Sequence, residues 1–208
     1  MTRTLFLASK YLGGLKAVLP AHPAELRTVF IPTAGTAYAD APWIDQEREW
    51  LSRNGFIFQD LELARADVSQ VAHVIDSAEL VIVPGGNTYF LLHHMQRTRF
   101  WDALKPTESV YAGVSAGAIV TCPDVAYIDD LDERELAPDL ATTQGGWLVD
   151  FFVLPHIDDV RVHDKISRII DGWTAGDRLV TLADDQAVIV SDGGDRTVRS
   201  PKVTHMID

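Results

Sequence analysis

The sequence has little cysteine and little positive charge, and it contains no long hydrophobic run. Its 208 residues include one cysteine, Cys122, so no disulfide can form within the chain, and we expect a reducing compartment, the cytoplasm. Lysine and arginine number 18 against 30 acidic residues, and this net charge of −12 argues against sequence-independent binding to nucleic acid. No apolar stretch could span a bilayer, and the apolar residues 5–8 are too few for a signal peptide.

The chain does contain a regular alternation of strand-like and helix-like segments. Hydrophobic residues make up 47% of it, enough for one substantial core, so we predict a single domain over residues 1–208. The expected strands cover 5–8, 28–32, 56–61, 80–83, 110–114, 149–154, 179–182 and 187–190, and the clearest helices cover 43–51 and 68–77, with another after Asn87. This order predicts an α/β domain with a doubly wound, mostly parallel sheet, whose ligand site lies at the carboxyl ends of the central strands.

The segment 110–120, Val-Tyr-Ala-Gly-Val-Ser-Ala-Gly-Ala-Ile-Val, has the pattern of a nucleophile elbow. An apolar run turns at Gly113, presents the hydroxyl of Ser115 and continues through small residues into a helix-compatible stretch. Such a bend would lift Ser115 above the sheet edge and point the amide of Ala116 toward a developing oxyanion. An ordinary strand-to-helix turn could use the same small residues for packing, so this segment needs support from elsewhere.

A second glycine-containing loop, at 84–88, directly follows the apolar run 80–83. Gly85 and Gly86 would let the backbone approach a ligand closely and expose its amides, while Asn87 can cap the following helix. We expect the Gly86 amide to be the second oxyanion donor, with Gly85 and Asn87 in contact with substrate. A tight turn with a helix cap is the alternative; a phosphate loop is disfavoured because no G-x-x-x-x-G-K-[ST] motif is present.

Ser115 needs a base, because a neutral hydroxyl is a weak nucleophile. Among seven histidines, His156 is the best placed, since the strand-like run before it delivers it to a strand end. For the acid that orients the imidazole, the sequence offers Asp184 and the adjacent Asp185, of which only one can face the site in an extended chain. The acidic run 129–133 is interpreted as a solvated loop.

Three blocks together resemble the signature of the dipeptidase E family of serine peptidases, also called aspartyl dipeptidases, to which the cyanophycinases are related. They are Pro-Gly-Gly-Asn-Thr at 84–88, Gly-Val-Ser-Ala-Gly-Ala at 113–118 and Leu-Pro-His at 154–156. The resemblance implies a class I glutamine amidotransferase-like α/β fold and the cleavage of short peptides after an N-terminal aspartate, without a metal or cofactor.

When the residue roles of the family are transferred by position, the resemblance implies that Ser115 is the nucleophile and His156 the base. It also implies that the amides of Gly86 and Ala116 are the oxyanion donors. The acidic member of the family pattern, usually Glu, corresponds to Asp184. Asp185 is the near alternative, and Asp130 stands close to a further Asp of the pattern, in the loop beyond the nucleophile helix.

Recognition of an aspartyl side chain in the substrate requires a cation. The candidates are Arg161 and Arg168, which follow His156 in the sequence. The expected partner is a short peptide, with no nucleic acid and no membrane, and a homodimer is a possible assembly. A metal site is not expected, since no H-E-x-x-H motif or cysteine pair occurs.

Two other interpretations stay open. An α/β-hydrolase esterase has its catalytic residues in the order Ser, Asp, His, which Ser115, Asp184 and His205 would satisfy. A noncatalytic binding protein on the same fold is the second alternative. We favour the peptidase, because Ser115, His156 and an acid all fall at predicted strand ends.

Overall fold

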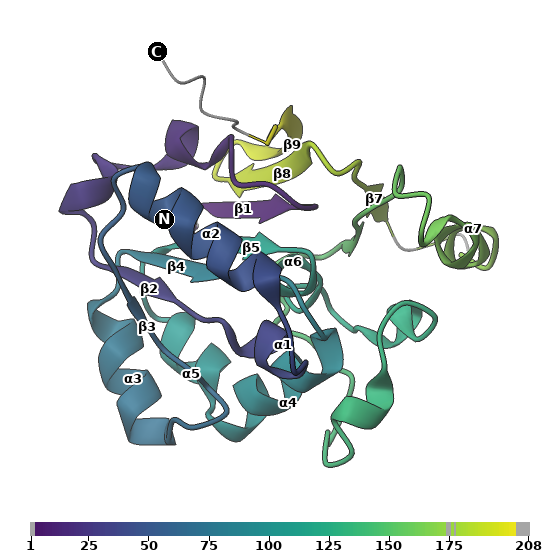
Figure 1. The fold of residues 1–208 in the computed structure, drawn as a ribbon, viewed down its shortest axis with the longest axis horizontal. Coiled ribbons are helices and arrows are strands. Elements are labelled where there is room, and N and C mark those ends of the chain that lie inside the picture. The colour runs from purple at the N-terminus through teal and green to yellow at the C-terminus, as the bar shows by residue number, and fades with distance from the viewer. Residues whose placement is uncertain (1–2, 174–175, 177, 203–208) are drawn as a thin grey trace.

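The computed structural model describes residues 3–173, 176 and 178–202, which form an α/β structure around a seven-stranded sheet (Figure 1). The strand order is β3-β2-β4-β5-β1-β8-β9. Neighbouring strands from β3 to β1 pair in parallel, and β8 and β9 add an antiparallel hairpin. The bounds are β1 Leu5–Ala8, β2 Thr28–Phe30, β3 Phe58–Asp60, β4 Leu80–Val83, β5 Val110–Val114, β8 Gln186–Ser191 and β9 Gly194–Arg199. The mostly parallel, doubly wound sheet predicted from the alternation is confirmed.

Helices cover both faces of this sheet. The α-helices are α1 Thr33–Thr36, α2 Pro42–Arg53, α3 Val68–Ser77, α4 Thr88–Arg97, α5 Phe100–Leu104, α6 Ala116–Ile119 and α7 His163–Asp171. The described residues also form the short 3₁₀ helices η1 Leu15–Val18, η2 Pro23–Glu25, η3 Ala126–Ile128 and η4 Arg134–Leu136. Within the described ranges, no helix combines the length and the apolar character needed to cross a membrane.

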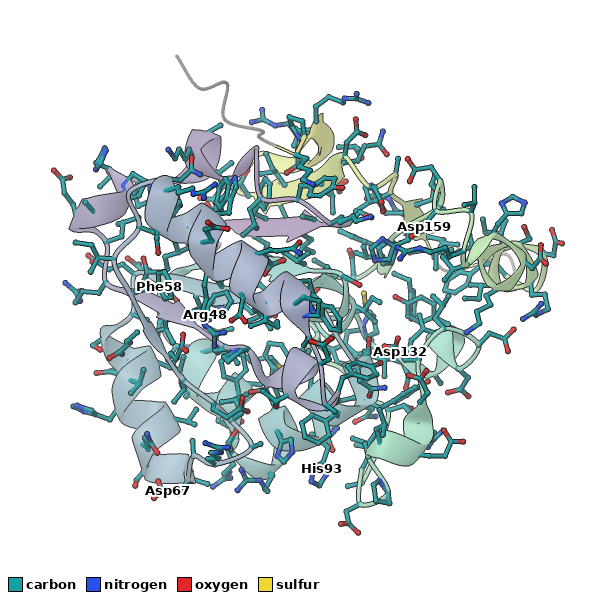
Figure 2. The ribbon with its side chains drawn as sticks, viewed as in Figure 1. Arg48, Phe58, Asp67, His93, Asp132 and Asp159 are labelled. Atoms are coloured by element: carbon teal, nitrogen blue, oxygen red, sulfur yellow. The ribbon has the colours of Figure 1, made fainter. Side chains whose placement is uncertain are left out.

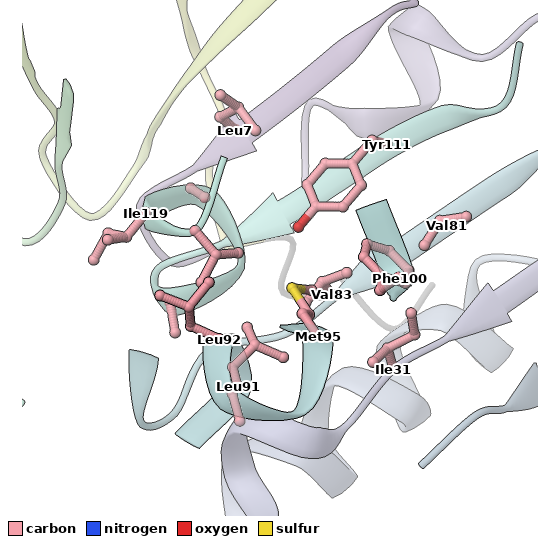
Figure 3. Packing of buried hydrophobic residues seen from close by; sticks show 14 of the residues in the cluster. Leu7, Ile31, Val81, Val83, Leu91, Leu92, Met95, Phe100, Tyr111 and Ile119 are labelled. Carbon is pink, nitrogen blue, oxygen red and sulfur yellow. The ribbon is translucent and has the colours of Figure 1, made fainter. Parts of the chain in front are cut away.

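The core has two layers because side chains alternate across each strand. Leu5 and Leu7 of β1 join the larger cluster, with α3, α4, α5 and α6, whereas Phe6 and Ala8 face the cluster beneath α2. Figure 3 shows the larger cluster, in which Tyr111 of β5 lies near side chains of β4 and α4. The central strands β1, β2, β4 and β5 are therefore buried on both faces, as their continuous apolar runs predict.

Two expected strands do not join the main sheet. β6 Phe152–Leu154 and β7 Leu179–Thr181 pair in parallel with each other in a separate two-stranded sheet. β7 and α7 lie beyond the end of β1 (Figure 1). His156, which follows β6, still reaches the carboxyl edge of the main sheet, where its amide donates to the hydroxyl of Ser9. The expectation that runs 149–154 and 179–182 belong to the mostly parallel sheet is wrong, because the two strands pair with each other instead. Most of their buried apolar side chains still join the larger core cluster, whereas Leu154 packs with α7.

Candidate active site

Ser115 lies at the bend between β5 and α6, with a left-handed φ of 49° and ψ of −110°. Such a conformation is costly for a residue with a side chain and persists only where its surroundings fix it. The flanking glycines make it feasible: a Cβ on Gly113 would lie 2.3 Å from the Gly117 carbonyl oxygen, and one on Gly117 would lie 2.0 Å from that of Val83. The strand, tight turn and helix predicted at this segment are therefore present.

Two hydrogen bonds connect Ser115 with His156 and Asp184. The Ser115 Oγ lies 3.0 Å from Nε2 of His156, and Nδ1 of the same ring lies 2.7 Å from Oδ1 of Asp184. A carboxylate only accepts, so Nδ1 carries the hydrogen toward Asp184, and Nε2 is left to accept from the serine hydroxyl. The sequence separations are 41 and 28 residues, so only the fold brings these side chains together.

His156 reaches Ser115 from the end of β6, and Asp184 comes from the loop between β7 and β8. His156 also has a left-handed backbone, with a φ of 65°, immediately after the stiff Pro155. Its side chain is 25% exposed and that of Asp184 is 19% exposed. The hydrogen-bonded chain is thus half-buried yet open to a ligand at the sheet edge.

Asp184 has a second partner, the ammonium group of Lys10, which contacts Oδ2 at 2.5 Å. Burial alone would raise the pKa of Asp184, but the hydrogen bonds from His156 and Lys10 outweigh it and lower that pKa. The carboxylate is therefore ionised at neutral pH and engaged through both of its oxygens.

The other two acids considered for this role have different partners. Asp185 pairs with Arg199 of β9, while Asp130 accepts a 2.8 Å hydrogen bond from Arg168. The carboxylate in contact with the imidazole is consequently that of Asp184. His205 lies outside the described residues.

The two arginines predicted to bind substrate are both exposed and paired with carboxylates. Arg161 contacts Asp159 and is 76% exposed, and Arg168 contacts Asp130. The pKa of Arg161 is raised mainly by its hydrogen bond with Asp159, and the charge of Asp184 adds to this. Binding of substrate by either arginine stays a prediction.

The glycine-containing loop lies directly against Ser115. A Cβ on Gly85 would lie 3.1 Å from Cβ of Ser115, and Gly86 has a φ of 146°, with its backbone packed on Ala34. Trp43 of α2 fixes the loop by donating a 3.0 Å hydrogen bond from its indole to the Gly85 carbonyl. The loop is thus rigid at the point where it meets the serine.

Asn87 is fully buried and caps α4. Its Oδ1 accepts from the amide of Phe90 at 2.8 Å, and its Nδ2 donates to the Glu133 carbonyl at 2.9 Å. The helix cap that the sequence allowed is present. A contact between Asn87 and substrate stays a prediction.

The interpretation of the acidic run 129–133 as a solvated loop holds for Asp129, Asp130 and Glu133, which are exposed, but is wrong for Asp132. Asp132 is half-buried and accepts a 2.7 Å hydrogen bond from the amide of Thr88, and burial raises its pKa. Glu133 accepts from the Tyr38 phenol. Figure 2 shows Asp132 and Asp159 on separate loops beyond the main sheet. Composition gave no signal for Asp132, because its burial depends on contacts with α4.

The sequence analysis also did not predict Lys10 as a site residue, although its position after a buried strand could have indicated it. It follows β1 by two residues, at the same edge of the sheet as Ser115 after β5. A polar residue just beyond a buried parallel strand is a reasonable site candidate.

Together, the doubly wound sheet and the hydrogen-bonded serine, histidine and aspartate define an α/β hydrolytic enzyme. The model of peptidase family S51 matches residues 14–198. The chain belongs to this family and is a serine-type peptidase.

Curated relatives include uncharacterized peptidases of two bacteria. The protein of Listeria innocua is 30% identical over 167 residues, which cover 78% of this chain and 79% of the relative. That of Pasteurella multocida is 28% identical, and the match covers 91% and 94% of the two chains. A peptidase E of a Nostoc species is 30% identical over 133 residues, 62% of this chain and 52% of that protein.

Solved structures share the fold. A protein of Listeria monocytogenes EGD-e, provisionally assigned as a peptidase E, superposes with a TM-score of 0.88 over 96% of this chain and 99% of its own, at 24% identity. A peptidase from an acI-B1 actinobacterium gives a TM-score of 0.72 over 96% and 88%, at 20% identity.

Proposed function

We propose that this peptidase hydrolyses short peptides through an acyl-enzyme on Ser115, with His156 as base and Asp184 as the group that orients the imidazole. The observation that carries the proposal is the hydrogen-bonded chain itself, 3.0 Å from Oγ to Nε2 and 2.7 Å from Nδ1 to Oδ1. A base within hydrogen-bonding reach, held in turn by an acid, is the arrangement that activates a serine.

In the first half of the reaction, Oγ attacks the peptide carbonyl carbon while its proton passes to Nε2 of His156. The carbon–nitrogen bond then breaks, and the imidazolium returns that proton to the leaving amine. In the second half, water loses a proton to His156 and attacks the acyl-enzyme, which releases the acid and restores the Ser115 hydroxyl. Asp184 stabilises the imidazolium in both halves.

The oxyanion that forms at each attack needs two donors. We assign these to the backbone amides of Gly86 and Ala116. Ala116 is the first residue of α6, where an amide has no partner within the helix, and Gly86 belongs to the loop packed on Ser115.

The substrates that we propose are dipeptides with an N-terminal aspartate. Support comes from the signature blocks and from relatives named peptidase E. Arg161 and Arg168 are the cations that we propose to test for binding of the aspartyl carboxylate. If one of them has this role, its replacement by Met should raise KM for Asp-containing dipeptides and leave KM for Ala-containing ones unchanged.

A dipeptide library assayed with wild type, Ser115→Ala and His156→Ala tests the reaction. Both variants should lose at least about 10³-fold in kcat/KM. Matched controls are Ser52→Ala on α2 and His73→Ala on α3, both exposed, which should keep wild-type rates. Hydrolysis by Ser115→Ala at the wild-type rate would refute the assignment. An active His156→Ala together with an inactive His205→Ala would instead favour the esterase.

Labelling of Ser115 by a serine-directed phosphonate distinguishes between two hypotheses, a peptidase and a noncatalytic binding protein. We expect labelling in wild type and none in Ser115→Ala, whereas a folded wild type that stays unlabelled would favour the binding protein.

We also propose a cytoplasmic location, which the single Cys122 favours. We likewise propose that residues 1–208 form one domain and that the chain forms a homodimer. Light scattering on the purified chain tests the homodimer.

A further inference from the structure

The last residue of β1 and the two residues after it each contact one member of the Ser115–His156–Asp184 chain. The amide of Ser115 donates to the Ala8 carbonyl at 2.9 Å, and the amide of His156 donates to the Ser9 hydroxyl at 2.9 Å. Lys10 contacts Asp184 through its ammonium group. This segment, 8–10, can reach all three because β1 lies between β5 and β8 in the sheet.

On the basis of the proposed function, we infer that Ser9 and Lys10 are positioning residues. Ser9 holds the backbone of the base, and Lys10 holds the carboxylate that orients it. Neither touches the reacting atoms, so each acts through His156 or Asp184.

The case for Ser9 is the strained backbone that it supports. Ser9 is completely buried, and its own amide donates to the Gln186 carbonyl at 2.9 Å, which fixes it between β1 and β8. His156 has a φ of 65°, a conformation that a non-glycine residue keeps only under constraint. The hydrogen bond to Ser9 provides such a constraint beside the imidazole.

The case for Lys10 is the division of the Asp184 carboxylate between two partners. Oδ1 accepts from His156 and Oδ2 from Lys10, so the plane of the carboxylate is fixed relative to the ring. The amide of Asp184 donates to Asp158 at 2.7 Å, which holds the backbone as well. Without Lys10, the Asp184 carboxylate could rotate away from the imidazole.

Lys10 also sets the charge around the pair. Asp132, Asp158, Asp159, Arg161 and Tyr11 are the other titratable groups that bear on His156, Asp184 or Lys10. Arg161 is paired with Asp159, so Lys10 is the cation in direct contact with Asp184 among the described residues. The hydrogen bond and the charge of Lys10 help to lower the pKa of Asp184, so their removal lets that pKa rise, and the carboxylate takes up a proton at higher pH.

The test compares Lys10→Met, Lys10→Arg and the control Lys16→Met, which removes an exposed charge on η1. We measure the pH dependence of kcat/KM and, independently of any peptide, the pH dependence of phosphonate labelling at Ser115. At neutral pH, Lys10→Met should lower both rates roughly tenfold, which corresponds to the free energy of one charge-assisted hydrogen bond. The acidic limb of each pH profile, where the rate falls as the pH is lowered, should move to higher pH. Lys10→Arg should keep the limb in place, and Lys16→Met should match wild type.

An acidic limb that does not move in Lys10→Met, or that moves equally in Lys10→Arg, would overturn the role of Lys10. If wild type itself is not labelled, the proposed function fails. If wild type is labelled and Lys10→Met behaves identically, only the positioning role fails.

Ser9→Ala removes an acceptor but no charge. We expect kcat to fall by roughly tenfold with KM nearly constant and the acidic limb unmoved, and Ser9→Thr, which keeps the hydroxyl, to recover most of the rate. Thermal unfolding checks that the variants are folded. A folded Ser9→Ala with the wild-type kcat would overturn the role of Ser9, and the Lys10 variants test the segment even if Ser9→Ala does not fold.

Discussion

The phenol of Tyr111 donates a 2.7 Å hydrogen bond to the carbonyl of Gly117, on the other side of the bend that carries Ser115. Tyr111 belongs to β5 and is completely buried, whereas Gly117 belongs to α6. This bond joins the strand to the helix six residues later and braces the turn between them.

Replacing Tyr111 with Phe should therefore destabilise the protein by about 1–3 kcal/mol, because the Gly117 carbonyl loses a buried partner. Labelling of Ser115 by a phosphonate should slow as well. Urea unfolding and labelling rates measure the two effects. Tyr38→Phe is the control, since it removes a more exposed phenol bonded to Glu133 and should cost less stability. Equal stability of Tyr111→Phe and wild type would contradict the bracing role.

Gly117→Ala should be far more damaging, with a loss of more than about 3 kcal/mol or no folded protein. The added Cβ would lie 2.0 Å from the Val83 carbonyl oxygen, and neither β4 nor α6 can move without disturbing the core. Thermal unfolding is the measurement. Gly193→Ala, in the β8–β9 turn, meets nothing closer than 4.0 Å and should unfold close to wild type. A stable Gly117→Ala would mean that α6 and β4 are further apart than described.

Gly85→Ala should leave the fold intact and affect Ser115 instead. Its Cβ would lie 3.1 Å from Cβ of Ser115 and 3.7 Å from Oγ, a close contact without backbone overlap. We expect a stability change within about 1 kcal/mol and a clear loss in labelling rate, because the methyl group restricts the serine. Gly86→Ala is the informative comparison: its Cβ would lie 2.2 Å from the Ala34 carbonyl oxygen, so stability should also fall. Unchanged labelling of Gly85→Ala would argue that the loop stands further from Ser115.

Glu47 of α2 should make stability depend on pH. Its Oε2 is buried without a hydrogen-bond partner among the described residues, and burial raises the pKa of Glu47 to about 8 from its ordinary value of 4.5. The folded state therefore holds this proton to higher pH than the unfolded chain does. Stability from this group is complete below about pH 4.5 and is lost as the pH rises toward 8.

Glu47→Gln removes this dependence and should be more stable than wild type at pH 8 by about 1–4 kcal/mol, with a smaller difference at pH 5. Urea unfolding at several pH values measures the difference. Glu49→Gln on the same helix is the control, since Glu49 is 57% exposed, and its effect should stay within about 0.5 kcal/mol. A difference between Glu47→Gln and wild type that does not change with pH would refute the account.

The local residue pattern alone was sufficient to predict most of the helices and strands. The helix at 68–77 and the strand at 80–83 form with the predicted bounds, because a continuous apolar run and a 3.6-residue period are properties of short segments. The strand at 194–199 was missed since it is a polar edge strand, with little of the alternation that marks a half-buried strand. The strand expected at 56–61 narrows to β3, whose side chains are half-buried or exposed.

The sequence by itself determined that a strained serine and a pair of glycines would end buried strands, because only small residues permit those bends. The tertiary structure decided which carboxylate meets His156. Asp184, Asp185 and Asp130 have the same side chain, so the resemblance could favour Asp184 but not exclude the others, and contacts with Lys10, Arg199 and Arg168 distinguish them. It also placed β6 and β7 outside the main sheet. Such choices depend on contacts between residues far apart in the chain, and no local pattern carries them.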